Sequence, residues 1–133
     1  MTVGAAQLGS IQKADSRQAD VAGMIVLLEE AAQKGCDFAV FPELAPTTFF
    51  PRWCTEDQAV LDQCFERDMP NAATRPLFEA AKHGIAVSSG HAELTPEGQH
   101  YNASILTDKI GAIVAQYRKI DLPGDVSRFG VEC

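Results

Sequence analysis

The N-terminal part of the chain alternates between short apolar runs and one helical stripe. Residues 2–8 form an apolar run without turn residues, which is typical of a strand covered on both faces. After a candidate N-cap at Asp15 or Ser16, apolar residues recur at three- and four-residue spacing, which predicts an amphipathic helix. Residues 37–41 are a second apolar run, and Pro42, which lacks an amide donor, predicts its end. The order strand, helix, strand predicts two parallel strands with the helix on one face.

Two further helices are predicted in the middle of the chain. Residues 46–53 are rich in proline and aromatic side chains, and the pair Thr55 and Gln58 that follows has the spacing of a capping box at a helix start. A second helix is predicted to begin near Thr74 and to end at Gly84. We expect both helices to lie on the outside of a sheet.

The last part of the chain reads as strands. Three apolar runs, at residues 85–94, 100–107 and 112–118, are separated by turn-forming segments and predict antiparallel neighbours. No internal repeat, low-complexity tract or linker divides the chain, so the pattern predicts one α/β domain with parallel and antiparallel strands.

Composition and charge narrow the possible partners. The 46% hydrophobic and 22% charged fractions are ordinary for a soluble globular protein, and no apolar run approaches the roughly 20 residues of a membrane-spanning helix. A net charge of -7 with scattered basic residues disfavours nucleic acid and anionic membranes as partners. The first residues lack the basic and apolar stretches of a secretory signal, so we expect a cytoplasmic protein.

The cysteines and glycines predict neither a metal site nor a cofactor site. Cys36, Cys54, Cys64 and Cys133 have irregular spacing, without a C-x-x-C pair or a nearby histidine pair. Nothing indicates an oxidising compartment that would support a disulfide framework, so the first three are read as structural thiols. The turn at residues 9–12 lacks the glycine-rich phosphate loop of a doubly wound nucleotide-binding module.

Two residues are candidates for catalysis. Glu43 follows a buried strand, where partial burial is expected to raise its pKa and suit it to be a general base. Lys119 ends the last strand before a Leu-Pro-Gly turn, where an ammonium group can stabilise an oxyanion. Taken singly, each has a more common interpretation: a solvated loop glutamate, and an edge-strand lysine that discourages aggregation.

Taken together, these segments change the interpretation. Phe-Pro-Glu at residues 41–43 and Tyr-Arg-Lys at residues 117–119, before Leu-Pro-Gly, resemble the signatures of the nitrilase superfamily. Further stretches look like the N-carbamoyl-D-amino acid amidohydrolase branch in particular: Thr-Thr-Phe-Phe-Pro-Arg-Trp at 47–53, Arg-Pro-Leu-Phe-Glu at 75–79, Ala-Glu-Leu at 92–94 and Asn-Ala-Ser-Ile-Leu at 102–106.

The resemblance implies an α-β-β-α sandwich, of which this chain carries about half. Residues 1–124 are then expected to form a partial carbon-nitrogen hydrolase domain, an α/β unit with a mixed sheet and helices on one face. Residues 125–133 match no pattern of the family and are expected to be a separate C-terminal tail.

The resemblance also implies a catalytic triad of Glu, Lys and Cys. By similarity Glu43 is the general base and Lys119 stabilises the tetrahedral intermediate, whereas no residue that binds substrate can be named. Family members carry the nucleophilic cysteine some tens of residues after the lysine, so Cys133 is a poor match and this chain alone is expected to be inactive. Asp121 stands where the carbamoylases usually have histidine, and it could pair with Lys119 and weaken the local positive potential.

Two functional hypotheses follow. The first is thiol-dependent hydrolysis of the C-N bond of a small amide or N-carbamoyl-amino acid. The second is a catalytically inactive fragment that pairs its incomplete sheet with a copy of itself or with a complementary chain, for which a homo-oligomer is expected. Under the first, Glu43 and Lys119 should lie close together at strand ends, with residues 47–53 covering the mouth of the site.

Overall fold

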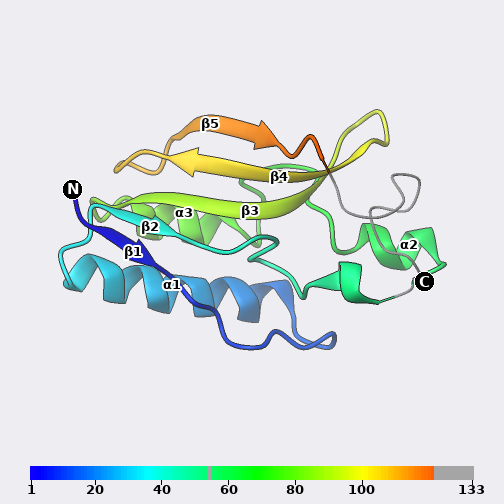
Figure 1. Ribbon diagram of the computed structural model, residues 1–133, viewed down its shortest axis with the longest axis horizontal. Coiled ribbons are helices and arrows are strands. Elements are labelled where there is room, and N and C mark those ends of the chain that lie inside the picture. Colours follow the sequence, from blue (N-terminus) through cyan, green and yellow to red (C-terminus); the bar gives the residue numbers. More distant parts are fainter. Residues whose placement is uncertain (54, 122–133) are drawn as a thin grey trace.

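The computed structural model describes residues 1–53 and 55–121, which form a five-stranded sheet with helices (Figure 1). The strands follow one another in the sheet in chain order: β1 (Val3–Ala5), β2 (Phe38–Val40), β3 (Ala86–Leu94), β4 (His100–Thr107) and β5 (Ile113–Arg118). Strands β1, β2 and β3 are parallel, whereas β4 runs antiparallel to both β3 and β5. The prediction of an α/β fold with a mixed sheet is confirmed.

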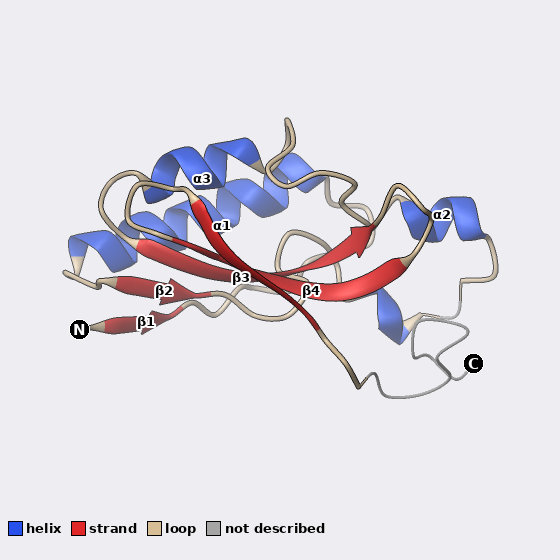
Figure 2. Cartoon of the chain, turned by 90° about the horizontal axis from the view of Figure 1, so that it is seen from above, coloured by secondary structure: helices blue, strands red, loops and turns tan. Residues whose placement is uncertain are grey.

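Two helices cover one face of this sheet (Figure 2). Helix α1 (Arg17–Gln33) begins at Ser16, whose side chain accepts a hydrogen bond from the amide of Ala19, as the N-cap pattern predicts. It packs beside α3 (Arg75–Ala81), and buried side chains of both helices form one core with alternate residues of the strands. That core contains Val21, Met24, Leu28, Ala39, Leu77, Phe78, Ala81, Val87 and Ile105.

The remaining helices lie beyond one end of the sheet (Figure 1). They are a 3-10 turn, η1 (Phe50–Arg52), and the short helix α2 (Gln58–Asp62). The predicted capping box at Thr55 is wrong, because the N-cap of α2 is Asp57, whose carboxylate accepts from the amides of the next turn. No helix in the described part of the chain is long and apolar enough to cross a membrane.

Neither α1 nor α3 covers the other face of the sheet (Figure 2). Strand alternation places Leu106 and its cross-strand partner Ser88 on this face, because the neighbouring pair Thr107 and Val87 is buried on the helix side. Apolar side chains at the sheet edges are accordingly exposed, with 51% of Val3 and 57% of Tyr117 open to solvent. The candidate catalytic residues lie on this face.

Candidate active site

Glu43 lies in a short excursion of the chain out of the sheet, directly after β2. The amides of Phe41 and Ala45 donate hydrogen bonds to carbonyls of β3 at 2.8 and 3.0 Å, which mark where the chain leaves the sheet and where it returns. Between them Leu44 has a φ of 54°, an uncommon value outside glycine that persists where the surroundings fix the backbone. The excursion at residues 42–44 therefore holds Glu43 in a defined place.

A glycine of β3 makes room for this excursion. A Cβ atom built on Gly90 would lie 2.9 Å from the Cα of Glu43, 3.0 Å from the amide nitrogen of Leu44 and 3.1 Å from the carbonyl oxygen of Pro42. All three are backbone atoms, which cannot move aside as the end of a flexible side chain can. The missing side chain at Gly90 thus lets the loop that bears Glu43 lie directly on the sheet.

We predict that Gly90→Ala destabilises the protein by about 1–3 kcal/mol, the usual cost of overpacking. The matched control is Gly23→Ala in the interior of α1, where an added Cβ meets nothing within 4 Å. That change should instead stabilise the protein by about 0.5–1 kcal/mol, because alanine is the better helix former. Urea unfolding of both variants measures the difference, and a Gly90→Ala variant as stable as the parent would contradict the tight contact.

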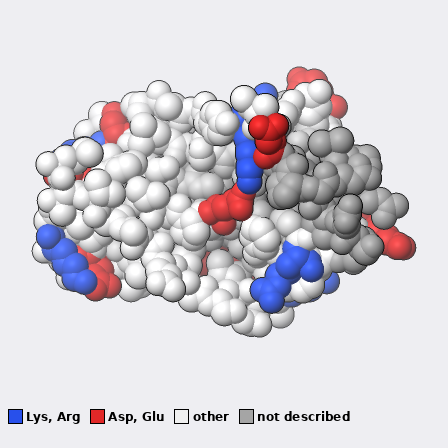
Figure 3. Space-filling model, viewed as in Figure 1, with Lys and Arg blue, Asp and Glu red and all other residues white. Residues whose placement is uncertain are grey.

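Lys119 directly follows β5 and contacts Glu43, which follows β2. Its amide donates to the carbonyl of Asn102 on β4 at 2.8 Å, and its Nζ lies 2.9 Å from Oε1 of Glu43. The side-chain amide of Asn102 also donates to this oxygen, at 2.5 Å. The lysine and glutamate side chains are 39% and 42% exposed. In the space-filling view of Figure 3, acidic and basic side chains touch near the middle of an otherwise mostly uncharged surface. The prediction that Glu43 and Lys119 lie together at strand ends is confirmed.

The environment of Glu43 favours its ionised form. Burial raises the pKa of its carboxyl, but hydrogen bonds from Lys119 and Asn102 outweigh burial and hold the pKa below the ordinary value. The sequence-based expectation of a raised pKa is therefore wrong, since it counted burial alone. Near neutral pH Glu43 is a carboxylate that can accept a proton.

The residue before Lys119 anchors the end of β5. Arg118 donates two hydrogen bonds of 2.7 Å to the carboxylate of Glu93 on β3, and its guanidinium lies 4.3 Å from the ring centre of Tyr101 on β4. The arginine thus reaches across the strand next to its own, and a bidentate pair of this kind restrains orientation as well as distance. The hydrogen bonds from Arg118 lower the pKa of Glu93. This clamp fixes the strand end from which Lys119 projects.

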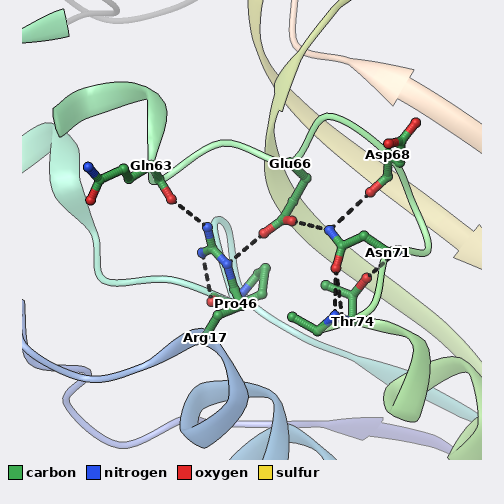
Figure 4. A network of polar contacts seen from close by, with 8 residues as sticks. Arg17, Pro46, Gln63, Glu66, Asp68, Asn71 and Thr74 are labelled. Carbon is green, nitrogen blue, oxygen red and sulfur yellow. Dashed lines mark hydrogen bonds and ion pairs between the residues drawn. The ribbon is translucent and has the colours of Figure 1, made fainter. Parts of the chain in front are cut away.

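A second polar network reaches the chain shortly after Glu43, at Pro46 (Figure 4). Arg17, the first residue of α1, donates to the carbonyls of Pro46 at 3.0 Å and Gln63 at 2.9 Å, and its Nε lies 2.8 Å from Glu66. Glu66 is only 5% exposed and also accepts a hydrogen bond from the side chain of Asn71. The network joins α1, the chain after Glu43 and the segment after α2.

The other residues singled out in the sequence have varied positions. Asp121 is exposed, and the ion pair of Lys119 within the described residues is with Glu43, so the predicted Asp121 pair is not formed. Cys36 and Cys64 are half-buried free thiols, and burial raises the pKa of Cys64, which makes it a poor nucleophile. Cys54 and Cys133 lie outside the described residues.

The segment at residues 47–53, which is expected to cover the site, is held by contacts with other parts of the chain. In residues 47–53, Thr48 bonds to the carbonyl of Ile11 at 3.2 Å and Phe50 packs against Phe65, with ring centres 5.2 Å apart. Phe50 shares a cluster with Leu44, beside Glu43, but that the segment covers the site stays a prediction. Within residues 1–53 and 55–121, no group of three or more His, Cys, Asp or Glu side chains is arranged to hold a metal ion.

Comparison with known proteins gives the family. The family model for carbon-nitrogen hydrolases matches residues 2–132. A 2-oxoglutaramate amidase of Bacillus subtilis (strain 168) is 31% identical over 93 residues, which cover 70% of this chain and 33% of the relative. Nitrilase 3 of an unknown prokaryotic organism is 33% identical over 117 residues, which cover 79% of this chain and 34% of the relative. The chain thus spans about a third of the length of these curated relatives.

The fold also matches solved structures. The amidase NitN from Nesterenkonia sp. AN1 superposes with a TM-score of 0.75 over 97% of this chain and 48% of its own length, at 21% sequence identity. A variant of that amidase shows the result of Michael addition of acrylamide at its active-site cysteine. The division of the present chain at residue 124 falls outside the described residues and stays a prediction. On the family match and the fold, the chain belongs to the carbon-nitrogen hydrolase family, the nitrilase superfamily.

Proposed function

We propose that this chain supplies the general base and the oxyanion-stabilising cation of a thiol-dependent amide hydrolase. The observation that carries the proposal is the 2.9 Å contact between Nζ of Lys119 and Oε1 of Glu43, two residues that are 76 positions apart in the sequence. A carboxylate kept ionised beside an ammonium group is suited to accept a proton and to stabilise negative charge in one reaction.

In the proposed reaction the nucleophile is a cysteine that lies outside residues 1–133, in the C-terminal part of a carbon-nitrogen hydrolase. Glu43 takes the thiol proton, and the thiolate sulfur forms a bond to the carbonyl carbon of the substrate. The negative charge that develops on the carbonyl oxygen is stabilised by Lys119. The C-N bond then breaks, and Glu43 returns the proton to the leaving ammonia or amine. Glu43 next takes a proton from water, whose oxygen forms a bond to the acyl carbon. The C-S bond then breaks, the acid is released, and Glu43 gives its proton to the departing thiolate, which restores the free thiol and the carboxylate.

The substrate class is a small amide or an N-carbamoyl-amino acid. The small amide is supported by the acrylamide bound covalently in the Nesterenkonia amidase variant. The ureido group is supported by the carbamoylase-like segments at residues 47–53 and 102–106. Both groups present a carbonyl carbon bonded to nitrogen, so the same base and cation serve either, and relative rates of ammonia release decide between them.

A second candidate function is pairing without catalysis. It is favoured by the uncovered sheet face, where Val3, Val40 and Tyr117 are 51%, 37% and 57% exposed. Apolar residues on one open face suit association with a copy of this chain or with a complementary chain. Sedimentation of the purified chain tests this candidate, since a monomer at micromolar concentration would argue against self-pairing.

The proposal is tested by ammonia release from butyramide and from N-carbamoyl-amino acids. The chain is assayed alone and after mixing with the C-terminal part of a carbon-nitrogen hydrolase that carries the usual cysteine. We expect hydrolysis only in the mixture, and its loss after a thiol-blocking reagent. Thiol-dependent turnover by the chain alone that Cys133→Ala abolishes would overturn the assignment of the nucleophile to another cysteine.

A further inference from the structure

Asn102 bonds to both candidate catalytic residues. It lies on β4, between β3 and β5, and strand alternation places its side chain on the face opposite that of its buried neighbour Ala103. Its side-chain amide donates to Oε1 of Glu43 at 2.5 Å, and its backbone carbonyl accepts the amide of Lys119 at 2.8 Å. One residue of β4 is thus tied to the glutamate through its side chain and to the lysine through its backbone.

We propose that Asn102 is a positioning residue that holds the carboxylate of Glu43 in the orientation needed for proton transfer. The consequence for catalysis rests on the proposed function, whereas the positioning contact itself does not. Among the described residues, Lys119 is the charged group that faces Glu43. Of the two side chains that donate to the carboxylate of Glu43, Lys119 is therefore charged and Asn102 is neutral.

The two donors leave one oxygen of the carboxylate open. Asn102 and Lys119 both bind Oε1, and within the described residues Oε2 of Glu43 accepts no hydrogen bond. Since Oε1 is occupied, Oε2 is the atom that can receive a proton from a thiol or from water. The hydrogen bond from the amide of Asn102 to Oε1 thus determines that Oε2 is the oxygen that takes the proton.

A neutral donor has a use that a second lysine would lack. When Lys119 turns toward an oxyanion on the substrate, its bond to Glu43 lengthens, and Asn102 still holds the carboxylate. An amide has no proton to lose in the neutral range, so its bond persists at every working pH. Because the amide of Asn102 is neutral, Lys119 remains the cation that stabilises negative charge on the substrate oxygen.

The contact is tested by NMR titration of the Glu43 side-chain carboxyl in the 133-residue chain, with Asn102→Ala and Asn102→Asp variants. Both should raise the pKa of Glu43, because a hydrogen bond that favours the ionised form is lost. Asn102→Asp should raise it further, since it adds a like charge while keeping the shape of the side chain. The Asp variant therefore also serves if the Ala variant unfolds.

The matched control is Gln58→Ala. It removes another side-chain amide that donates to a carboxylate, Asp62 at 2.7 Å, away from the candidate site, and it should leave the titration of Glu43 unchanged. A merely structural role for Asn102 predicts altered stability with the parent's titration of Glu43. That result in both variants would overturn the proposal.

The rate measurement separates this proposal from the proposed function. In the hydrolysing mixture, Asn102→Ala should lower kcat by up to about 100-fold with little change in KM, as misplacement of a catalytic group does. A shifted Glu43 titration with an unchanged kcat would overturn the catalytic importance of this positioning and leave the contact standing, whereas the base role of Glu43 is tested separately by Glu43→Gln. An unshifted titration overturns the positioning role whatever the rate.

Discussion

Glu43→Gln is expected to lower kcat of the assembled hydrolase by about 10²–10⁴-fold, the range that a general base contributes. Glutamine keeps the size of the side chain and can still bond to Asn102, but it cannot take the thiol proton. Lys119→Ala should cost about 10²–10³-fold, as the loss of one oxyanion donor does. Initial rates at saturating amide measure both effects.

The combined variant sharpens the test. Because Glu43 and Lys119 are proposed to act on the same intermediate, the double variant should be little slower than the slower single variant, far from the product of the two losses. The control is Lys109→Ala, which breaks a comparable exposed contact, 2.6 Å from Asp37, away from the candidate site. Its kcat should match the parent. Either site variant near the full rate would refute the assigned role.

The main elements of the fold could be predicted because their signals are local. Helix α1 ends just before Gly35, and a cap at Ser16 begins it, so one short stretch of sequence specifies both limits. The strands β3, β4 and β5 lie within the predicted apolar runs because turns with Asp, Gly and Pro separate them. The sequence predicts Thr55 as the cap of α2, whereas the structure has Asp57. Both residue types are good N-caps, so tertiary packing decides between them.

The candidate pair could be predicted for a similar reason. Glu43 and Lys119 each follow an apolar run that a proline-containing turn ends, and strand ends gather at the edges of a sheet. The supporting residues could not be predicted this way. The bond from Asn102 depends on the register of β4 against β5, and the contact of Gly90 depends on the excursion at residues 42–44. Neither the strand register nor the path of residues 42–44 can be predicted from a short stretch of sequence, because both depend on contacts between distant segments.

The error in the pKa of Glu43 has the same origin. Its position after a buried strand was enough to predict partial burial, which by itself raises a carboxyl pKa. Burial is the largest single influence, but the hydrogen bonds of two donors, from β4 and from the end of β5, together with the charge of Lys119 outweigh it and lower the pKa. The sign of the shift is therefore a property of the assembled sheet, which a single sequence segment does not contain.

Arg17 shows where a sequence signal was present but weak. A cation in the first turn of a helix is unfavourable with the helix dipole, so another interaction must hold it there. That interaction is the pair with Glu66 at 2.8 Å, in which the two side chains are 18% and 5% exposed (Figure 4). The carbonyls of Pro46 and Gln63 accept the other guanidinium hydrogens.

Breaking this pair is expected to cost more stability than any exposed ion pair in the described part of the chain. Arg17→Met leaves the carboxylate of Glu66 buried without its cation, and removal of one partner of a buried pair costs about 3–5 kcal/mol. The double variant Arg17→Met with Glu66→Met should recover part of this loss, since no charge is then left buried. The control is Lys34→Met, which breaks the exposed helical pair with Glu30 and should cost about 0.5 kcal/mol or less. Urea unfolding of the parent, of these three variants and of Glu66→Met alone measures the coupling. An Arg17→Met variant no less stable than Lys34→Met would mean that the network of Arg17 does not hold α1 to the loop that follows Glu43.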